Sequence, residues 1–356
     1  MKVIDADGHV EESVAMFTRL EDEYVPRRPL ALGFDRDTAY GSFNAVWLID
    51  GEVYPKLLGK GAFIFVTPTL MEGAKAKAAS IPAQELTDVP ARLADLDQAG
   101  IDQQVVYPTL FLATTTEDVA MEAALFRAYN TFMAEACRSS GGRIHFAALV
   151  PIRNVEESAR ELRRAKELGA VSAMLLGVAW DRSLKDRALW PFYEEAASLD
   201  MPICLHFGWG CPSITAPFTW GDSFNSATLP VLMGARSVLG SGVMEEIPRL
   251  RFAFLETGSQ WMPWVIHQIK RGGNMRRDPA EYFREGRAYI ACEADEDINY
   301  LVNVLGEDCF VVASDYPHSD FSREDNLRSA IMKREDVPIR VREKILCENP
   351  QRLYSL

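Results

Sequence analysis

Histidine is scarce in this sequence, and positive charge is outnumbered by negative charge. The 356 residues include five histidines and six cysteines, with 38 lysines and arginines against 51 acidic residues, for a net charge of -13. A chain of this kind lacks the clustered basic surface that holds a nucleic-acid backbone, so we expect no nucleic-acid partner. No two cysteines are spaced as CxxC. This spacing argues against a zinc knuckle, and we expect free thiols.

Long apolar runs are also missing. No uninterrupted apolar stretch reaches the ~18 residues that a membrane-spanning helix needs, so we expect no membrane partner. The opening MKVIDADGHV has neither the apolar core of a secretion signal nor the composition of a transit peptide. We therefore expect a cytoplasmic protein. The hydrophobic content of 48% is sufficient for one large buried core.

Short apolar runs alternate with longer helical patterns along most of the chain, the helical ones including 116–139, 155–168, 190–199 and 295–305. The apolar runs predict eight strands, at 3–8, 102–107, 144–150, 171–176, 202–207, 250–256, 288–293 and 309–314. Eight strands separated by helices are typical of an α/β fold of the (β/α)8 TIM-barrel type. An open doubly wound sheet is the alternative, but the first strand is followed by DADGHVEE rather than a glycine-rich phosphate turn.

One segment departs from this alternation. Residues 18–84 are rich in glycine, proline and aromatic residues and show little periodicity. We predict a single barrel domain over 1–356, with 18–84 as an insertion after the first strand that folds over the barrel mouth. A lid and a dimer contact are both open interpretations of this insertion.

The few histidines lie at informative places. His9 follows the first predicted strand, His206 ends ICLHF, and His318 follows the last strand in VVASDYPHSD. Asp7 lies two residues before His9, on the same face of an extended segment, and Asp315 is at the tip of the last strand. At any single position a packed histidine or a helix-capping aspartate is the more common outcome. Together they favour a divalent metal site, because the C-terminal ends of barrel strands surround one mouth.

Seven pieces of the sequence resemble the amidohydrolase-related TIM-barrel family, the group that includes aminocarboxymuconate-semialdehyde decarboxylase. They are IDADGH, ADLDQAGIDQQVVYP, ALVP, PICLHFG, LETGSQWMP, ASDYPH and ENPQRLY, and they run nearly end to end. The resemblance implies that Asp7, His9, His206 and Asp315 bind the metal. Asp7 stands where most of the family has a histidine, and a carboxylate there favours Mn or Fe over Zn.

Two further departures from the family bear on the mechanism. Family decarboxylases carry an acid/base histidine after the sixth strand, where this chain has Glu256, and this exchange speaks against decarboxylation. The lysine that bridges two metals in dinuclear members is missing from VSAMLLG in the fourth strand. The potential ligands at the mouth are then Asp7, His9, Glu12, His206, Glu256, Asp315 and His318. They suit either two Fe or Mn ions, or one ion with Glu12, Glu256 and His318 around it.

Two chemistries are open for such a site. A carboxylate-rich pair of Fe or Mn ions resembles that of amidohydrolase-related monooxygenases, and we lean towards O2-dependent hydroxylation with Glu256, Asp315 and His318 as catalytic groups. The alternative is that one or two ions, Zn included, serve hydrolysis, hydration or non-oxidative decarboxylation of a small carboxylated substrate. A third hypothesis is an inactive barrel that serves as a partner subunit. A homodimer, or a pairing with a related subunit, is the general expectation for assembly.

Aromatic residues near the predicted mouth are candidates to contact a small-molecule substrate. Three of them lie in GWGCPSITAPFTWGDSF, the long loop after the fifth strand. The candidate set is Trp209, Phe218, Trp220, Trp261 and Glu293. Packing in the core is an equally open interpretation of the aromatic residues. Arg153, just after ALVP, is placed either to meet a substrate carboxylate or to lie in an exposed loop.

Overall fold

Eight parallel strands form the centre of the protein. The computed structural model describes residues 1–33, 45–56, 62, 68, 79–215, 224–273, 276–319 and 322–356. The strands of the central sheet are β1 (Ile4–Val10), β5 (Gln103–Pro108), β6 (Ile144–Leu149), β7 (Ser172–Leu176), β8 (Ile203–His206), β9 (Phe252–Leu255), β10 (Ala288–Ala291) and β11 (Phe310–Val311). They pair in chain order, each parallel to the next. All eight predicted strands are therefore confirmed.

The sheet curls into a nearly closed barrel. The backbone N–H of Ala6 donates to the carbonyl of Val312 at 3.0 Å, and that of Asp315 donates to the carbonyl of Asp7 at 3.1 Å. These bonds join β1 to the segment after β11. The predicted (β/α)8 fold is confirmed, and the ends of the first and last strands lie side by side.

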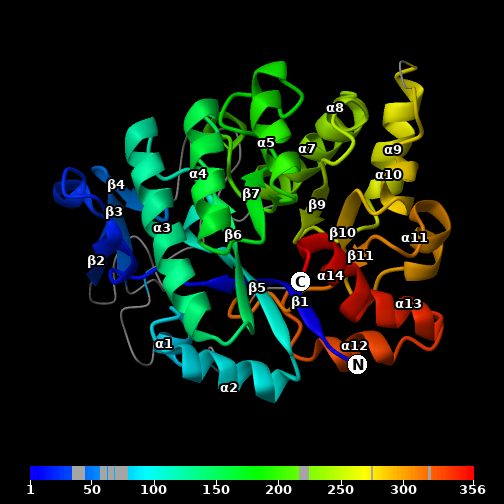
Figure 1. Ribbon diagram of the computed structural model, residues 1–356, viewed down its shortest axis with the longest axis horizontal. Coiled ribbons are helices and arrows are strands. Elements are labelled where there is room, and N and C mark those ends of the chain that lie inside the picture. The colour runs from blue at the N-terminus through cyan, green and yellow to red at the C-terminus, as the bar shows by residue number, and fades with distance from the viewer. Residues whose placement is uncertain are drawn as a thin grey trace.

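Helices follow most strands and surround the barrel (Figure 1). The longer ones are α2 (Val89–Ala99), α3 (Val119–Ser139), α4 (Val155–Glu167), α5 (Trp190–Ser198), α7 (Leu229–Gly240), α9 (Met262–Arg271) and α11 (Ile298–Leu305). Several begin at a side chain that accepts backbone N–H groups of the first turn, as Asp88 does for α2, Asp118 for α3 and Asn154 for α4.

Shorter elements fill the connections between these helices and the strands. The short α-helices are α1 (Ile81–Gln84), α6 (Pro212–Thr215), α8 (Val243–Glu246), α10 (Ala280–Arg284), α12 (Leu327–Met332), α13 (Ile339–Glu343) and α14 (Asn349–Tyr354). The single turns are η1 (Met16–Arg19), η2 (Val25–Arg27), η3 (Leu110–Leu112), η4 (Arg187–Leu189), η5 (Phe224–Thr228) and η6 (Lys344–Glu348). In the last helix the Tyr354 hydroxyl donates to the carbonyl of Ala6 at 2.7 Å, which ties the end of the chain to β1.

The segment after β1 contains a small antiparallel sheet that the sequence did not predict. It consists of β2 (Leu30–Gly33), β3 (Ala45–Ile49) and β4 (Glu52–Tyr54), in that order, and it lies beside α3 in Figure 1. Arg27 makes ion pairs with Asp50 and with Asp118, the residue that caps α3. The sheet is thereby attached to the start of α3. The lid and dimer interpretations of residues 18–84 remain predictions.

Across the described ranges, no helix combines the length and the apolar character needed to cross a membrane. All six cysteines are free thiols, as predicted.

Candidate metal centre

Two side chains of β1 define one edge of the candidate site. Asp7 and His9 are both buried, and the pairing of β1 with β5 shifts register between Asp5 and Gly8. A Cβ at Gly8 would overlap the side chain of Gln104, so the glycine leaves room for this side chain. The His9 Nδ1–H donates to the carbonyl of Pro108 at 2.9 Å, and this bond turns Nε2 towards the barrel mouth.

Carboxylates from three strand ends surround His9 Nε2. Its distances are 3.5 Å to Asp7 Oδ1, 3.3 Å to Asp315 Oδ1 and 3.8 Å to Glu256 Oε2. From the end of β8, His206 Nε2 lies 3.1 Å from Asp7 Oδ2, and His206 Nδ1 lies 3.3 Å from Glu256 Oε2. Residues that are up to 308 positions apart in the numbering, from Asp7 to Asp315, are thus brought into one cluster.

The cluster fits a divalent metal ion. Two overlapping sets of ligand atoms lie within 4.8 Å of one another: Asp7, His9, His206 and Glu256, and then His9, Glu256, Asp315 and His318. Ligands bound at about 2.0–2.2 Å to one ion lie roughly 3 to 3.5 Å apart. Four of the five distances above fall in this range, and the fifth, from His9 Nε2 to Glu256 Oε2, is 3.8 Å. The hydrogen bond between His206 Nε2 and Asp7 goes to Oδ1, at 3.2 Å. Asp7 Oδ2 and His9 Nε2 are buried, and although both lie near other potential ligands, neither makes a hydrogen bond in the described part of the chain. Buried polar atoms in this condition are what an ion would satisfy.

The electrostatics of His9 suit the same role. Burial, together with repulsion by His318 and His206, lowers the pKa of His9 well below its usual value. Its imidazole is therefore neutral around pH 7. Neutral imidazole is the form that binds a metal.

His318 completes the histidine cluster. Its ring stacks on His9, with ring centroids 4.1 Å apart, and its Nδ1 lies 2.7 Å from Asp315 Oδ1. The other oxygen of Asp315 accepts a hydrogen bond from the Ser322 hydroxyl at 3.0 Å. Asp315 is in this way oriented by contacts on both of its oxygens.

Two of the site carboxylates have unusual backbone conformations. Glu256 follows β9 at a φ of 55°, and Asp315 follows β11 at a φ of 52°. The left-handed region is costly for residues other than glycine and is found at functional sites. At both positions the turn redirects the side chain just past the strand end, where the cluster forms.

Glu12 is the predicted ligand that the structure does not bring into the cluster. Its carboxylate accepts backbone N–H groups from Thr109, at 3.1 Å, and from Leu110, at 2.6 Å. Burial raises the pKa of Glu12 to about 8, although these hydrogen bonds oppose the shift. Glu12 lies outside both sets of convergent ligand atoms.

Beneath the cluster lies a polar network that the sequence did not reveal. The fully buried Arg92 donates to the carbonyl of His9 at 2.8 Å and to Gln104 Oε1 at 2.7 Å. Gln104 in turn donates to Asp5 at 2.6 Å, and Asp5 accepts the backbone N–H of Ser314 at 2.8 Å. The network connects the backbone around His9 with the strand end that precedes Asp315. An arginine in a helical pattern gives no sign in the sequence that it is buried.

A pocket of about 240 Å³ opens beside the cluster. Glu256 and Asp315 line it together with Glu293, which the sequence named as a candidate substrate contact, and Arg323. Burial, then repulsion by Glu296 and Asp295, raises the pKa of Glu293. The pocket gives a small molecule access to the two site carboxylates.

The predicted aromatic contacts have other positions. Trp209 is buried, and its indole N–H donates to the Ser226 hydroxyl at 2.9 Å. Trp261 packs edge-on against Phe254, and its indole N–H donates to backbone carbonyls of the preceding turn. Among the described residues neither tryptophan lines the pocket beside the cluster. Phe218 and Trp220 lie outside the described residues.

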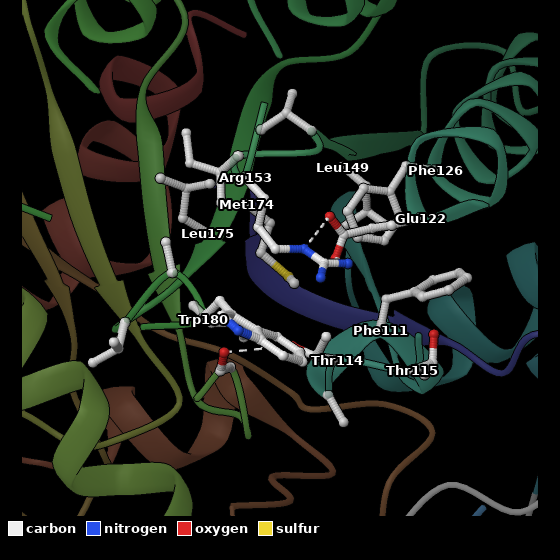
Figure 2. Close-up of a pocket in the computed structure, with 17 residues that line it drawn as sticks. Phe111, Thr114, Thr115, Glu122, Phe126, Leu149, Arg153, Met174, Leu175 and Trp180 are labelled. Atoms are coloured by element: carbon white, nitrogen blue, oxygen red, sulfur yellow. Dashed lines mark hydrogen bonds and ion pairs between the residues drawn. The ribbon is translucent and has the colours of Figure 1, made fainter. Parts of the chain in front are cut away.

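The side chain of Arg153 is held in place by contacts with other residues of the protein. Figure 2 shows its guanidinium turned towards Glu122, with the ring of Trp180 beside it. These residues line a separate small cavity of about 50 Å³. Arg153 Nη2 lies 2.9 Å from Glu122 Oε1 and donates to the carbonyl of Thr116 at 2.8 Å. Its guanidinium carbon is 4.8 Å from the centre of the Trp180 ring. These contacts brace the loops after β5 and β6.

A barrel with histidines and carboxylates gathered at its strand ends defines a metal-dependent enzyme of the amidohydrolase type. The sequence profile of the amidohydrolase family matches residues 4–356, and the chain belongs to this family. The resemblance noted from the sequence motifs is thereby confirmed.

Two similar proteins are named as decarboxylases. The chain is 24% identical over 242 residues to 2-amino-3-carboxymuconate-6-semialdehyde decarboxylase of Dictyostelium discoideum, covering 65% of this chain and 67% of that protein. It is 25% identical over 325 residues to gamma-resorcylate decarboxylase of Polaromonas sp., covering 81% of this chain and 95% of that protein. These relatives give no support to the predicted lean towards oxygenation.

Solved structures share the fold. An amidohydrolase from Mycobacterium avium subsp. paratuberculosis superposes with a TM-score of 0.78 at 20% identity, covering 100% of this chain and 98% of that one. The 5-carboxyvanillate decarboxylase of Novosphingobium aromaticivorans, a structure with bound manganese, superposes with a TM-score of 0.66 at 20% identity, covering 80% and 85%.

Proposed function

We propose that this protein is a metal-dependent decarboxylase that removes CO2 without oxidation from a small carboxylic acid. The observation that carries the proposal is the pair of overlapping ligand sets that share His9 and Glu256. Two carboxylates of these sets, Glu256 and Asp315, line a pocket of about 240 Å³. The decarboxylases among the relatives support it. Non-oxidative decarboxylation was one of the alternatives predicted from the sequence, and we now prefer it to O2-dependent hydroxylation.

The ligand set favours a hard divalent ion. Asp7, His9, His206 and Asp315 would hold the ion, with His318 stacked against His9 at its side. Two carboxylates among these four donors favour Mn or Fe over Zn, and manganese is bound in the solved 5-carboxyvanillate decarboxylase. Held by these residues, such an ion would supply Lewis-acid chemistry, the withdrawal of electron density from substrate oxygens.

Glu256 is our candidate for the proton donor. Loss of CO2 breaks the bond between a carbon atom and its carboxylate, and the electron pair left on that carbon must be taken by a proton. Glu256 lines the pocket and reaches the cluster, with Oε2 at 3.3 Å from His206 Nδ1. It stands where family decarboxylases carry an acid/base histidine, and a carboxylic acid in its protonated form performs the same transfer. From the sequence, Glu256 in place of this histidine argued against decarboxylation. As a proton donor, Glu256 is compatible with decarboxylation.

One positively charged residue of the pocket, Arg323, supports an acidic substrate. Arg323 lines the pocket, and its guanidinium is the one cationic group among the described lining residues. An arginine is suited to orient a carboxylate in a planar, bidentate contact. Arg323 also pairs with Asp325 at 2.7 Å, so substrate binding would compete with this exposed partner.

The test is a direct assay of CO2 release by the manganese-loaded protein. The first substrates are 2,6-dihydroxybenzoate and 5-carboxyvanillate, the acids named for two of the solved decarboxylases. We expect one CO2 per product, no dioxygen uptake, and loss of activity on chelation. Glu256→Gln should lower kcat by about 100-fold or more, the usual size of an acid/base contribution. Glu246→Gln, an exposed carboxylate outside the site, is the matched control.

The same assay separates the competing chemistries. Dioxygen consumed in step with product would contradict the proposal and restore the hydroxylation hypothesis. Product formed by water addition, with no CO2, would indicate a hydrolase or hydratase. Metal analysis of the active protein counts the ions per chain and so distinguishes one ion from two.

A further inference from the structure

A hydrogen bond from outside the cluster reaches the far side of the His318 ring. Thr109 Oγ1 lies 3.0 Å from His318 Nε2, while His318 Nδ1 lies 2.7 Å from Asp315 Oδ1. The two nitrogens of the ring thus face different partners, on opposite sides of the ring. One side of His318 points into the metal centre, and the other points to a threonine at the end of β5.

Thr109 is itself firmly placed. It is 5% exposed and lies directly before the turn η3. Its backbone N–H donates to both oxygens of Glu12, at 3.1 and 3.3 Å, and the N–H of Leu110 donates to Glu12 Oε2 at 2.6 Å. Glu12 is 3% exposed. A buried carboxylate from the segment after β1 therefore holds the turn that presents the Thr109 hydroxyl.

We propose that Thr109 is a positioning residue for His318, and that Glu12 acts through Thr109 rather than as a metal ligand. The three residues are connected across the mouth, from the segment after β1 through the end of β5 to the loop after β11. Glu12 accepts the backbone N–H of Thr109, and the Thr109 hydroxyl contacts His318. This inference rests on the proposed function only in that His318 belongs to the metal centre.

The chemistry of the hydroxyl explains why a threonine serves here. His318 contacts the proposed metal ligand Asp315 through Nδ1. A second contact, at Nε2, fixes the rotation and tautomer of the ring, and so the support that the ring gives to this ligand. A hydroxyl both donates and accepts, so Thr109 can pair with Nε2 in either tautomer. The buried β-branched side chain has little freedom at χ1, and the hydroxyl is held in one direction.

The experiment measures manganese binding by the full-length chain stripped of metal. Free Mn2+ is followed by electron paramagnetic resonance during titration of wild type, Thr109→Val, Thr109→Ser and His318→Ala. Valine keeps the shape of threonine and the backbone N–H to Glu12, while serine keeps the hydroxyl. We expect Thr109→Val to weaken Mn2+ binding by about tenfold or more, as is usual for loss of such a partner. Thr109→Ser should stay within about twofold of wild type.

A double variant distinguishes positioning from a general loss of structure. If Thr109 acts through His318, adding Thr109→Val to His318→Ala weakens Mn2+ binding no further. An equal loss in both backgrounds would overturn the inference. So would unchanged Mn2+ binding in Thr109→Val or in His318→Ala. Wild-type protein that binds no Mn2+ at all would instead contradict the proposed function, so the two failures are distinguishable.

Discussion

His9 shows at the scale of one residue how the site is prepared for a metal. A backbone carbonyl, that of Pro108, accepts from Nδ1 and leaves Nε2 directed at the carboxylates of Asp7 and Asp315. Full burial keeps the ring neutral, since it lowers the pKa of His9. Orientation and protonation state are both set by the surrounding fold. This is the usual arrangement for a metal-binding histidine.

Glu12 gives a prediction for the pH dependence of stability. Burial raises the pKa of its carboxyl group from an ordinary 4.5 to about 8. The unfolded chain releases this proton at lower pH than the native chain does, so the native state binds more protons between about pH 4.5 and pH 8. The stability contributed by protonated Glu12 is therefore complete below pH 4.5 and is lost as the pH rises to about 8. One such group changes the free energy of unfolding by at most about 1.4 kcal/mol per pH unit.

Urea unfolding of metal-free protein between pH 5 and pH 8.5 tests this. Wild type should lose stability with rising pH more steeply than Glu12→Gln, whose amide oxygen still accepts the backbone N–H groups. Asp5, with a pKa raised to about 6 by burial, contributes with the same sign in both proteins, so the difference isolates Glu12. Parallel pH profiles would show that Glu12 ionises normally in the native protein.

The same residue shows a limit of inference from sequence. Its place three residues after His9 suggested a metal ligand. Regular alternation ends with β1 at Val10, and beyond that point spacing no longer determines where a side chain is directed. The buried backbone N–H groups of Thr109 and Leu110 bind the carboxylate instead. Thr109 was missed for a related reason, since one hydroxyl at a strand end is not a distinctive pattern.

At the scale of elements, Glu296 joins the loops after β9 and β10. Its carboxylate accepts the backbone N–H groups of Ser259, Gln260 and Glu293 and the hydroxyl of Ser259, at 2.6 to 3.0 Å. At Gly258, whose φ is 62°, a Cβ would lie 2.9 Å from Glu296 Oε1. The turn that begins with Glu256 is thus held closely against the next loop.

Removal of this carboxylate should destabilise the protein. Glu296→Ala leaves several buried N–H groups unpaired, and we expect the free energy of unfolding to fall by about 2–4 kcal/mol. Glu296→Gln keeps one accepting oxygen and should cost less. Glu335→Ala, at an exposed position, is the control in the same urea titration. A change below about 0.5 kcal/mol in Glu296→Ala would show that the two loops are held by other contacts.

The elements differ in how well the sequence predicts them. Barrel strands such as β8 and β9 are buried on both faces, so they form continuous apolar runs that are easily recognised. The three short strands β2, β3 and β4 were missed. In β2 every residue is at least partly exposed, so no apolar pattern marks it.

At the scale of the whole molecule, barrel closure makes the site. Hydrogen bonds between β1 and the segment after β11 bring Asp7 beside Asp315, and β8 delivers His206 to the same place. The sequence order of strands and the positions of histidines at their ends were enough to anticipate this convergence, because a closed parallel barrel has one C-terminal mouth. The polar network beneath the site could not be predicted from the sequence, because Arg92 and Gln104 come close to His9 only in the folded chain.

The central claim is that these strand ends bind a divalent metal ion, and metal content measures it most directly. Wild type and His206→Ala are loaded with Mn2+, freed of unbound ion, and analysed for manganese per chain, with circular dichroism to verify the fold. We expect stoichiometric manganese in wild type and its loss in His206→Ala, with the helical spectrum unchanged. Stoichiometric manganese retained by His206→Ala would contradict the account.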